Sequence, residues 1–305
     1  MNNNNFKGVS YTAGFFILIC LAILGFVISG VISLAILSST TGGSVSDLKD
    51  ALNDPRNANI LRIIQSISVL ISMFLPAWIV ASILYRKPFE LLGFKKNIQL
   101  KQAGLVFIIV FTSLFFAGAL AYLNKEIPIP VAWKQWFDNL EKSYAQQVEV
   151  MVSLKSLGGY IMSIFLMAFL PALCEETLFR GGLQNFLTRA IKNPWVAIIL
   201  VSILFSIVHF SFYGFLVRLF LGIILGLIFY LTGNIWLSIL AHFINNALVI
   251  TQAYVLTQQG KGIKEVMNDD MPTLYWGFFA LPFLYYLFRT LKNTSLRRQH
   301  ISEEN

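Results

Sequence analysis

The feature that most constrains this fold is a series of apolar runs long enough to cross a lipid bilayer. A bilayer core is about 30 Å thick, which about 20 helical residues span, and within lipid a helix pairs its own backbone groups. We therefore predict an all-α membrane protein, a bundle of about eight transmembrane helices. The runs cover approximately residues 13–37, 60–84, 102–123, 158–189, 195–212, 215–231, 235–256 and 273–291.

The composition agrees with a chain that lies mostly in lipid. Of its 305 residues, 56% are hydrophobic and 12% are charged, whereas a soluble domain is about 25% charged. No polar block is long enough to fold alone, so we predict one membrane domain with three parts. They are residues 1–156, with three transmembrane helices and an amphipathic connector at 133–152; residues 157–256, a helical core; and residues 257–305, with the last helix and a basic tail.

The net charge of +8 comes largely from basic residues near the ends of the apolar runs. Such clusters mark the cytoplasmic side of a membrane protein and contact anionic lipid head groups. Eight spans place both termini on one side, so we predict a multi-pass protein of the cell membrane with both termini cytoplasmic. Because the basic residues do not gather on a soluble face, we expect no nucleic-acid partner. The two clusters are Arg86, Lys87, Lys95, Lys96 and Lys101, and Arg289, Lys292, Arg297 and Arg298.

Two adjacent carboxylates and an arginine interrupt the run at 158–189. Ionised groups inside a bilayer cost several kcal/mol and therefore indicate function by default. Glu176 and Arg180 are four residues apart, share a helix face and can pair; a purely structural pair is the alternative. Glu175 is rotated by about 100° from Glu176, which leaves it free to face the bundle centre. We expect the pair to neutralise and orient, and Glu175 to be a general base.

Three polar residues of later runs can complete a site with Glu175. Glu175 lies eighteen residues before Asn193, in the predicted turn, and His209 lies sixteen after it, so antiparallel helices place both at nearly one depth. His242 is expected to be shallower unless helix tilt closes the gap. His242 and Asn246 share a face and can donate to a developing oxyanion, while His209 can hold a water beside Glu175.

Three short motifs in this region resemble those of the CPBP intramembrane proteases. They are Glu175-Glu176-x-x-x-Arg180, Phe205-x-x-x-His209 and His242-x-x-x-Asn246. That family includes the CAAX prenyl endopeptidases and bacterial bacteriocin-processing or self-immunity (Abi) proteins, and the resemblance covers about residues 157–256. It implies a catalytic helical core in which Glu175 activates water with His209, and His242 forms the oxyanion site with Asn246. The implied activity is an intramembrane endopeptidase that hydrolyses a membrane-associated protein or peptide.

The resemblance leaves a metal cofactor as a question, because the family is commonly labelled metalloprotease. A catalytic zinc takes about three protein ligands and a water, which Glu175, His209 and His242 could supply. The chain has no H-E-x-x-H sequence, asparagine is a poor zinc ligand, and two isolated cysteines, Cys20 and Cys174, offer no cysteine-rich site. We favour glutamate chemistry without a cofactor, with zinc as the alternative.

Two other function classes stay open from the sequence. One is a non-catalytic membrane partner, such as an immunity or chaperone-like factor that binds another membrane protein. The other is a transporter with a proton relay through the buried carboxylates, which the absence of a recognisable internal repeat disfavours. The sequence names neither the substrate, nor a prenyl group on it, nor the oligomeric state.

Overall fold

The computed structural model describes residues 5–41, 45–151, 156–260 and 274–303. Within these ranges the regular elements are helices, and no strand is present. Apolar side chains line the long helices because lipid surrounds them, and large hydrophobic residues accordingly remain exposed along α1 (Tyr11–Thr41) and other outer helices. The protein is therefore an all-α membrane protein, as the apolar runs predict.

In the described part of the chain before residue 157 there are nine helical elements, several of which are segments of one continuous helix. After α1 come α2 (Val45–Asn53), η2 (Pro55–Asn57), α3 (Ala58–Val69), the π-helical turn η3 (Leu70–Phe74), α4 (Leu75–Leu84), α5 (Pro88–Leu91), α6 (Leu100–Glu126) and α7 (Val131–Met151). From η2 to α4 the chain is one continuous membrane-crossing rod.

The elements from residue 157 onward carry the predicted site. They are α8 (Leu157–Ser163), the π-helical η4 (Ile164–Phe169), α9 (Leu170–Glu176), the π-helical η5 (Thr177–Gln184), α10 (Asn185–Ile191), α11 (Pro194–Ile207), α12 (Phe215–Thr232), α13 (Ile235–Gln258) and α15 (Leu274–Glu303). Elements α8 to α10 form a second continuous rod, residues 157–191.

Six helical segments of the described chain are long and apolar enough to cross a membrane. They are Tyr11–Thr40, Pro55–Leu84, Leu100–Glu126, Leu157–Ile191, Phe215–Thr232 and Ile235–Gln258, and α11 is a shorter apolar helix. The protein is thus multi-pass, while the count of eight spans stays a prediction.

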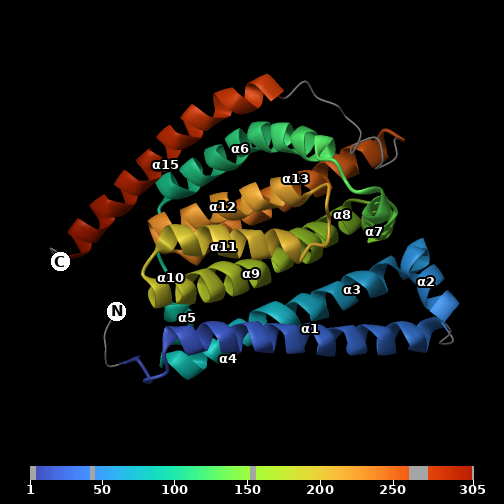
Figure 1. Ribbon diagram of the computed structural model, residues 1–305, viewed down its shortest axis with the longest axis horizontal. Helices are drawn as coiled ribbons and strands as arrows, with labels where there is room; N and C mark the ends of the chain where they lie inside the picture. Colours follow the sequence, from blue (N-terminus) through green and yellow to red (C-terminus); the bar gives the residue numbers. More distant parts are fainter. Residues whose placement is uncertain (1–4, 42–44, 152–155, 261–273, 304–305) are drawn as a thin grey trace.

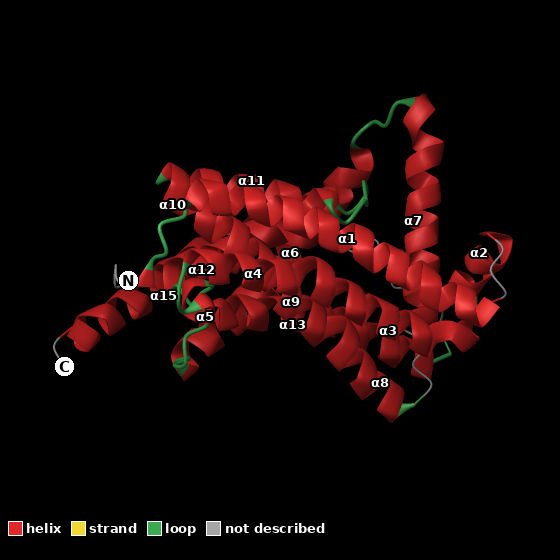
Figure 2. Ribbon diagram, turned by 90° about the horizontal axis from the view of Figure 1, so that it is seen from below, coloured by secondary structure: helices red, strands yellow, loops and turns green. Residues whose placement is uncertain are grey.

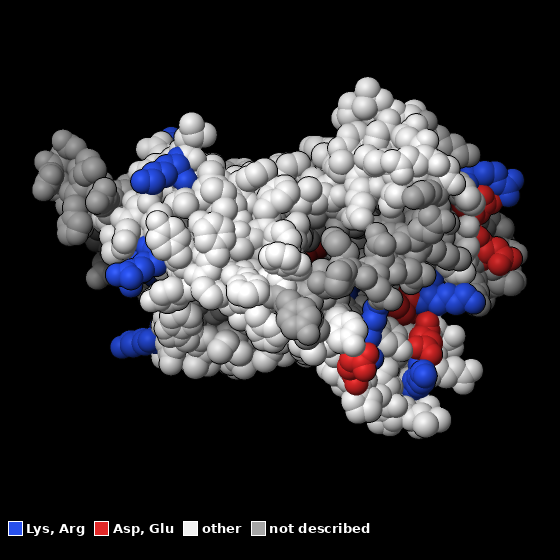
Figure 3. Space-filling model, turned by 90° about the horizontal axis from the view of Figure 1, so that it is seen from above, with Lys and Arg blue, Asp and Glu red and all other residues white. Residues whose placement is uncertain are grey.

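The long helices lie side by side along the long axis of the molecule (Figures 1 and 2), and α1 begins at the same end at which α15 finishes. One apolar core joins α1, α4, η5 and α11, and a second joins α6, α12, α13 and α15. In contrast, α7 runs across one end of the bundle (Figure 2). Figure 3 shows charged side chains at both ends and a nearly uncharged band between them, with only basic ones visible at the end where α15 finishes. The cytoplasmic assignment of that end remains a prediction.

The predicted helix over 195–212 is too long at its C-terminal end. The structure ends α11 at Ile207, after which the His209 N–H donates to the Ser206 carbonyl and the Phe210 N–H donates to the Ile207 carbonyl. Phe210 adopts a left-handed φ of 49°, which ends helical geometry. The apolar pattern could not reveal this end, because Phe210 and Phe212 continue the hydrophobic run.

Other predicted boundaries also change. The segment between the first two apolar runs contains the helix α2, and residues 42–44 within it lie outside the described residues. Pro76 and Pro171 each lie at the start of an α-helix that follows a π-helical turn, because proline lacks the N–H of a regular turn. The predicted basic tail is helical to Glu303; Thr273 and the side chains of Arg297 and Arg298 lie outside the part described.

Candidate active site

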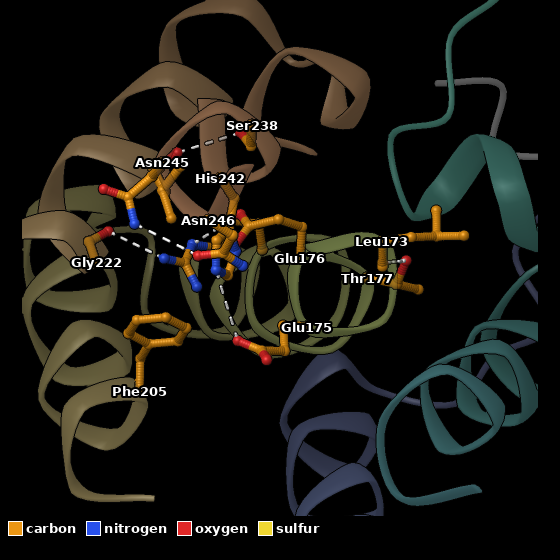
Figure 4. A network of polar contacts seen from close by, with 12 residues as sticks. Leu173, Glu175, Glu176, Thr177, Phe205, Gly222, Ser238, His242, Asn245 and Asn246 are labelled. Carbon is orange, nitrogen blue, oxygen red and sulfur yellow. Dashed lines mark hydrogen bonds and ion pairs between the residues drawn. The ribbon is translucent and has the colours of Figure 1, made fainter. Parts of the chain in front are cut away.

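The three predicted motifs meet in the interior of the bundle (Figure 4). Glu175 and Glu176 end α9, and Arg180 follows in η5. His209 lies in the turn after α11, and α13 carries His242 with Asn246. Segments far apart in sequence therefore supply one site, which is the arrangement that the depth argument predicts for Glu175 and His209.

Glu176 is the centre of a fully buried charged network. Its Oε2 lies 3.2 Å from Arg180 Nε, and its Oε1 lies 2.9 Å from His242 Nδ1. The side chains of Glu176 and Arg180 are 0% and 1% exposed. The ion pair predicted from their spacing is present, and the same carboxylate also holds the histidine of another helix.

The Arg180 guanidinium has two further contacts that fix it in the core. Its Nη2 donates to the Gly222 carbonyl at 3.3 Å, and its central carbon lies 4.7 Å from the Phe205 ring centroid. A buried charge requires such partners because its desolvation is costly. Glu176 and Arg180 together thus connect α9 to α12 and α13.

Glu175, one residue earlier, has a different environment. Its Oε2 lies 3.9 Å from His209 Nε2 and 3.9 Å from His242 Nε2. That oxygen is buried and has no hydrogen-bond partner, whereas the side chain as a whole is 12% exposed. Its equal distances to the two rings also show that His242 does not lie at the shallower depth expected from the sequence, because the helices are not the parallel rods of that argument.

The hydrogen-bond partners of the two rings define what each presents to Glu175. His209 Nδ1 lies 2.6 Å from the Phe205 carbonyl, which can only accept, so Nδ1 carries the hydrogen. In the neutral ring Nε2 is then an acceptor. His242 Nδ1 faces a carboxylate and also carries a hydrogen, which leaves both Nε2 atoms directed at one oxygen of Glu175.

Phe205 is a site residue whose part the sequence does not disclose. Its ring contacts the His209 ring at 4.8 Å and the His242 ring at 5.8 Å, besides the Arg180 contact. The four-residue spacing to His209 was visible in the second motif. Its contacts with two other helices depend on tertiary packing and were not.

Asn246 lies with Asn245 on the side of α13 that faces the carboxylates (Figure 4). The Asn245 amide nitrogen donates to Asn246 Oδ1 at 3.4 Å. Both side chains are half-buried, so an amide is placed next to the network without being enclosed by it. The pairing of Asn246 with His242 on an oxyanion stays a prediction.

The donor set can be tested against a tetrahedral zinc. Ligands bound at about 2.0–2.1 Å lie about 3.3 Å from one another, whereas Glu175 Oε2 is 3.9 Å from each histidine nitrogen. Among the described residues, no group of three or more His, Cys, Asp or Glu side chains has metal-site geometry. Glu175, His209 and His242 as they lie do not fit a tetrahedral zinc.

Comparison with protein families places the site in a matched region. Residues 157–248 match the family described as Type II CAAX prenyl endopeptidase Rce1-like. The match contains all three motifs, and it supports the family expected from them. Neither the search of curated proteins nor that of solved structures gave a match.

Proposed function

We propose, on the premise that residues 157–248 form a CAAX protease-like domain of the CPBP family, that this protein is an intramembrane endopeptidase in which Glu175 activates the attacking water. The family supports peptide-bond hydrolysis in the membrane. The observation that carries the residue assignment is the unpartnered Oε2 of Glu175 between two imidazole nitrogens at 3.9 Å. The substrate would be a membrane-associated protein or peptide.

The 3.9 Å separations suit a bridging water. Direct hydrogen bonds are about 2.7–3.2 Å long, and a water can link polar groups that lie farther apart. A water beside Glu175 and His209 would donate one hydrogen to the carboxylate and the other to His209 Nε2. Its oxygen lone pair would then be free to attack a carbonyl carbon.

The reaction needs one proton to move twice. Glu175 accepts a proton from the water as the new carbon–oxygen bond forms, and the peptide carbonyl becomes an oxyanion. As the carbon–nitrogen bond breaks, Glu175 returns that proton to the leaving amine nitrogen. Positioned proton transfer of this kind contributes about 10²–10⁴-fold to a rate.

His242 and Asn246 are the proposed donors to the oxyanion. A His242 ring that donates through both nitrogens is an imidazolium, whose charge the adjacent Glu176 carboxylate would balance. Two carboxylates, one guanidinium and one imidazolium then sum to no net charge in the buried network. Preorganised donors in such a site supply a large share of catalysis.

We propose that this chemistry requires no metal, because the donor separations support a water better than a tetrahedral zinc. The experiment is cleavage of a fluorogenic membrane-peptide library in detergent, with prenylated and unprenylated members, by wild type and Glu175→Gln. Cleavage by wild type that a chelator does not reduce is the expected result. Chelator-sensitive cleavage that zinc restores would contradict the metal-independent mechanism, and full activity of Glu175→Gln would reject the role of Glu175.

A further inference from the structure

The loop that carries His209 is held by α7, a helix outside the matched residues 157–248. We infer that Asp138 and Glu141 of α7 are positioning residues that keep His209 beside Glu175. The inference rests on the proposed function for its catalytic consequence, but its structural part can be measured separately. Neither residue touches the reacting atoms.

Three consecutive residues of the loop contact one face of α7. Ser211 Oγ donates to Glu141 Oε2 at 2.8 Å, and Tyr213 Oη donates to Asp138 Oδ1 at 2.6 Å. Between them the Phe212 ring packs against Phe137, with centroids 4.8 Å apart. Hydrogen bonds to carboxylates are stronger than those between neutral groups, so two strong hydrogen bonds attach the loop to α7.

The hydrogen bond from Tyr213 to Asp138 requires the Tyr213 hydroxyl to keep its hydrogen. The hydrogen bond to Asp138 raises the pKa of the Tyr213 hydroxyl to about 12, with desolvation and the carboxylate charge as smaller causes. The phenol therefore stays a donor at neutral pH. The Ser211 hydroxyl makes two hydrogen bonds: it accepts the Gly214 N–H at 3.1 Å and donates to Glu141.

The backbone between His209 and Ser211 explains why the loop needs an external support. Phe210 has a φ of 49°, a left-handed conformation that is unfavourable for a bulky residue and persists where surrounding contacts fix it. Ser211, the next residue, is the one bound to Glu141. Releasing that contact would allow Phe210 to relax and His209 to leave its place beside Glu175.

The end of α7 is itself fixed to the bundle. Arg62 of α3, which is buried, donates through Nε and Nη2 to the Met151 carbonyl at 2.9 and 2.6 Å. The helix is thus joined to α3 at its end and to the His209 loop along its length. Because α7 crosses the end of the bundle (Figure 2), it connects α3 to the loop that carries His209.

A second support makes it possible to test α7 without unfolding the loop. Asn124 of α6 is buried; it donates to the Phe212 carbonyl at 2.9 Å and accepts the Leu216 N–H at 2.8 Å. These backbone bonds anchor the start of α12 independently of α7. Variants of Asp138 or Glu141 should therefore loosen the segment around His209 while the helices stay packed.

The test is a pair of double-mutant cycles on the full-length protein in detergent: Glu141→Ala with Ser211→Ala, and Asp138→Ala with Tyr213→Phe. Each single change should lower kcat roughly ten- to hundredfold, as a small misplacement of a catalytic group does, with KM nearly unchanged. Each double variant should be no slower than its slower single variant, because both changes remove one contact. Glu141→Gln, which keeps an acceptor oxygen, should restore most of kcat, and exposed Lys142→Ala on the same helix is the control.

Hydrogen exchange over residues 208–214 gives the readout that needs no substrate. Faster exchange there in Glu141→Ala and Asp138→Ala, with unchanged exchange in α12, supports the positioning role. Unchanged exchange together with unchanged kcat overturns it, as does a loss of kcat that is additive in both cycles. If wild type cleaves no peptide, the proposed function is at fault, and the exchange of this loop still decides whether α7 holds it.

Discussion

The helices before residue 157 and those of the matched domain bury polar groups in different ways. In the earlier region, Ser29 and Ser72 bond to carbonyls of their own continuous helix. The one buried charged side chain among the described residues of that region, Arg62, donates to a backbone carbonyl and not to a carboxylate. In the matched domain, Glu176 and His242 are buried against each other across two helices.

This difference separates scaffold from site. A hydroxyl that bonds within its own helix keeps its hydrogen bond wherever the helix lies, so it does not constrain how the helix packs against its neighbours. A buried carboxylate bonded to another helix is satisfied at one arrangement only, and losing the partner leaves an uncompensated charge. The buried charged network of the matched domain therefore constrains how its helices pack more tightly than such hydroxyls do, and four predictions test this contrast.

The largest effect is expected from Glu175→Gln. The amide is close in shape but cannot accept the proton of a water, so turnover should fall about 10²–10⁴-fold. Thermal unfolding in detergent should be nearly unchanged because Oε2 accepts no direct hydrogen bond. The comparison is with Glu126→Gln, an exposed carboxylate of α6. A variant that unfolds earlier than wild type would mean that Glu175 belongs to the structural network.

The next effect concerns stability. Arg180→Ala removes the partner of buried Glu176 and should destabilise the protein by about 3–5 kcal/mol. Chemical unfolding of the variant in detergent measures this loss, with exposed Arg86→Ala as the matched control. If both variants lost the same stability, buried Arg180 would contribute no more to the stability of the fold than exposed Arg86.

Much of this contrast can be read from the sequence. The apolar runs predict the all-α bundle because lipid leaves few alternatives, and the four-residue spacing predicts the pairing of Glu176 with Arg180. The depth count also brings Glu175 to His209. Each of these inferences depends on local geometry or on the bilayer, which a sequence pattern contains.

The rest depends on how helices tilt and where they stop. The Nδ1 bond of His242 to Glu176 brings His242 to the depth of the two carboxylates, and no spacing in the sequence encodes that. The end of α11 before His209 is set by the left-handed Phe210 within an apolar run. The hydrogen bond between Ser211 and Glu141 of α7 joins segments that are distant in the sequence. The sequence showed only the amphipathic pattern of α7.

The comparison also predicts how the earlier region responds to added volume. A methyl group at Gly25 would lie 2.5 Å from the Ile71 carbonyl oxygen, whereas Gly30 on the same helix has nothing within 4 Å. Gly25→Ala should cost roughly 1–3 kcal/mol as overpacking does, and Gly30→Ala should be neutral or stabilising. Unfolding of both variants checks this, and a loss at Gly30 equal to that at Gly25 would contradict the close approach of α1 to η3.

The smallest effect is expected at the helix ends, where the two regions again differ. In the matched domain, Asn193 caps α11 by accepting the N–H groups of Trp195 and Val196, whereas Gln99 at the start of α6 makes no side-chain cap bond. Asn193→Ala should therefore cost about 1 kcal/mol and Gln99→Ala close to nothing. The same unfolding assay resolves them. A loss at Gln99 as large as that at Asn193 would contradict the difference between the two caps, because the Gln99 side chain makes no cap bond that the substitution could remove.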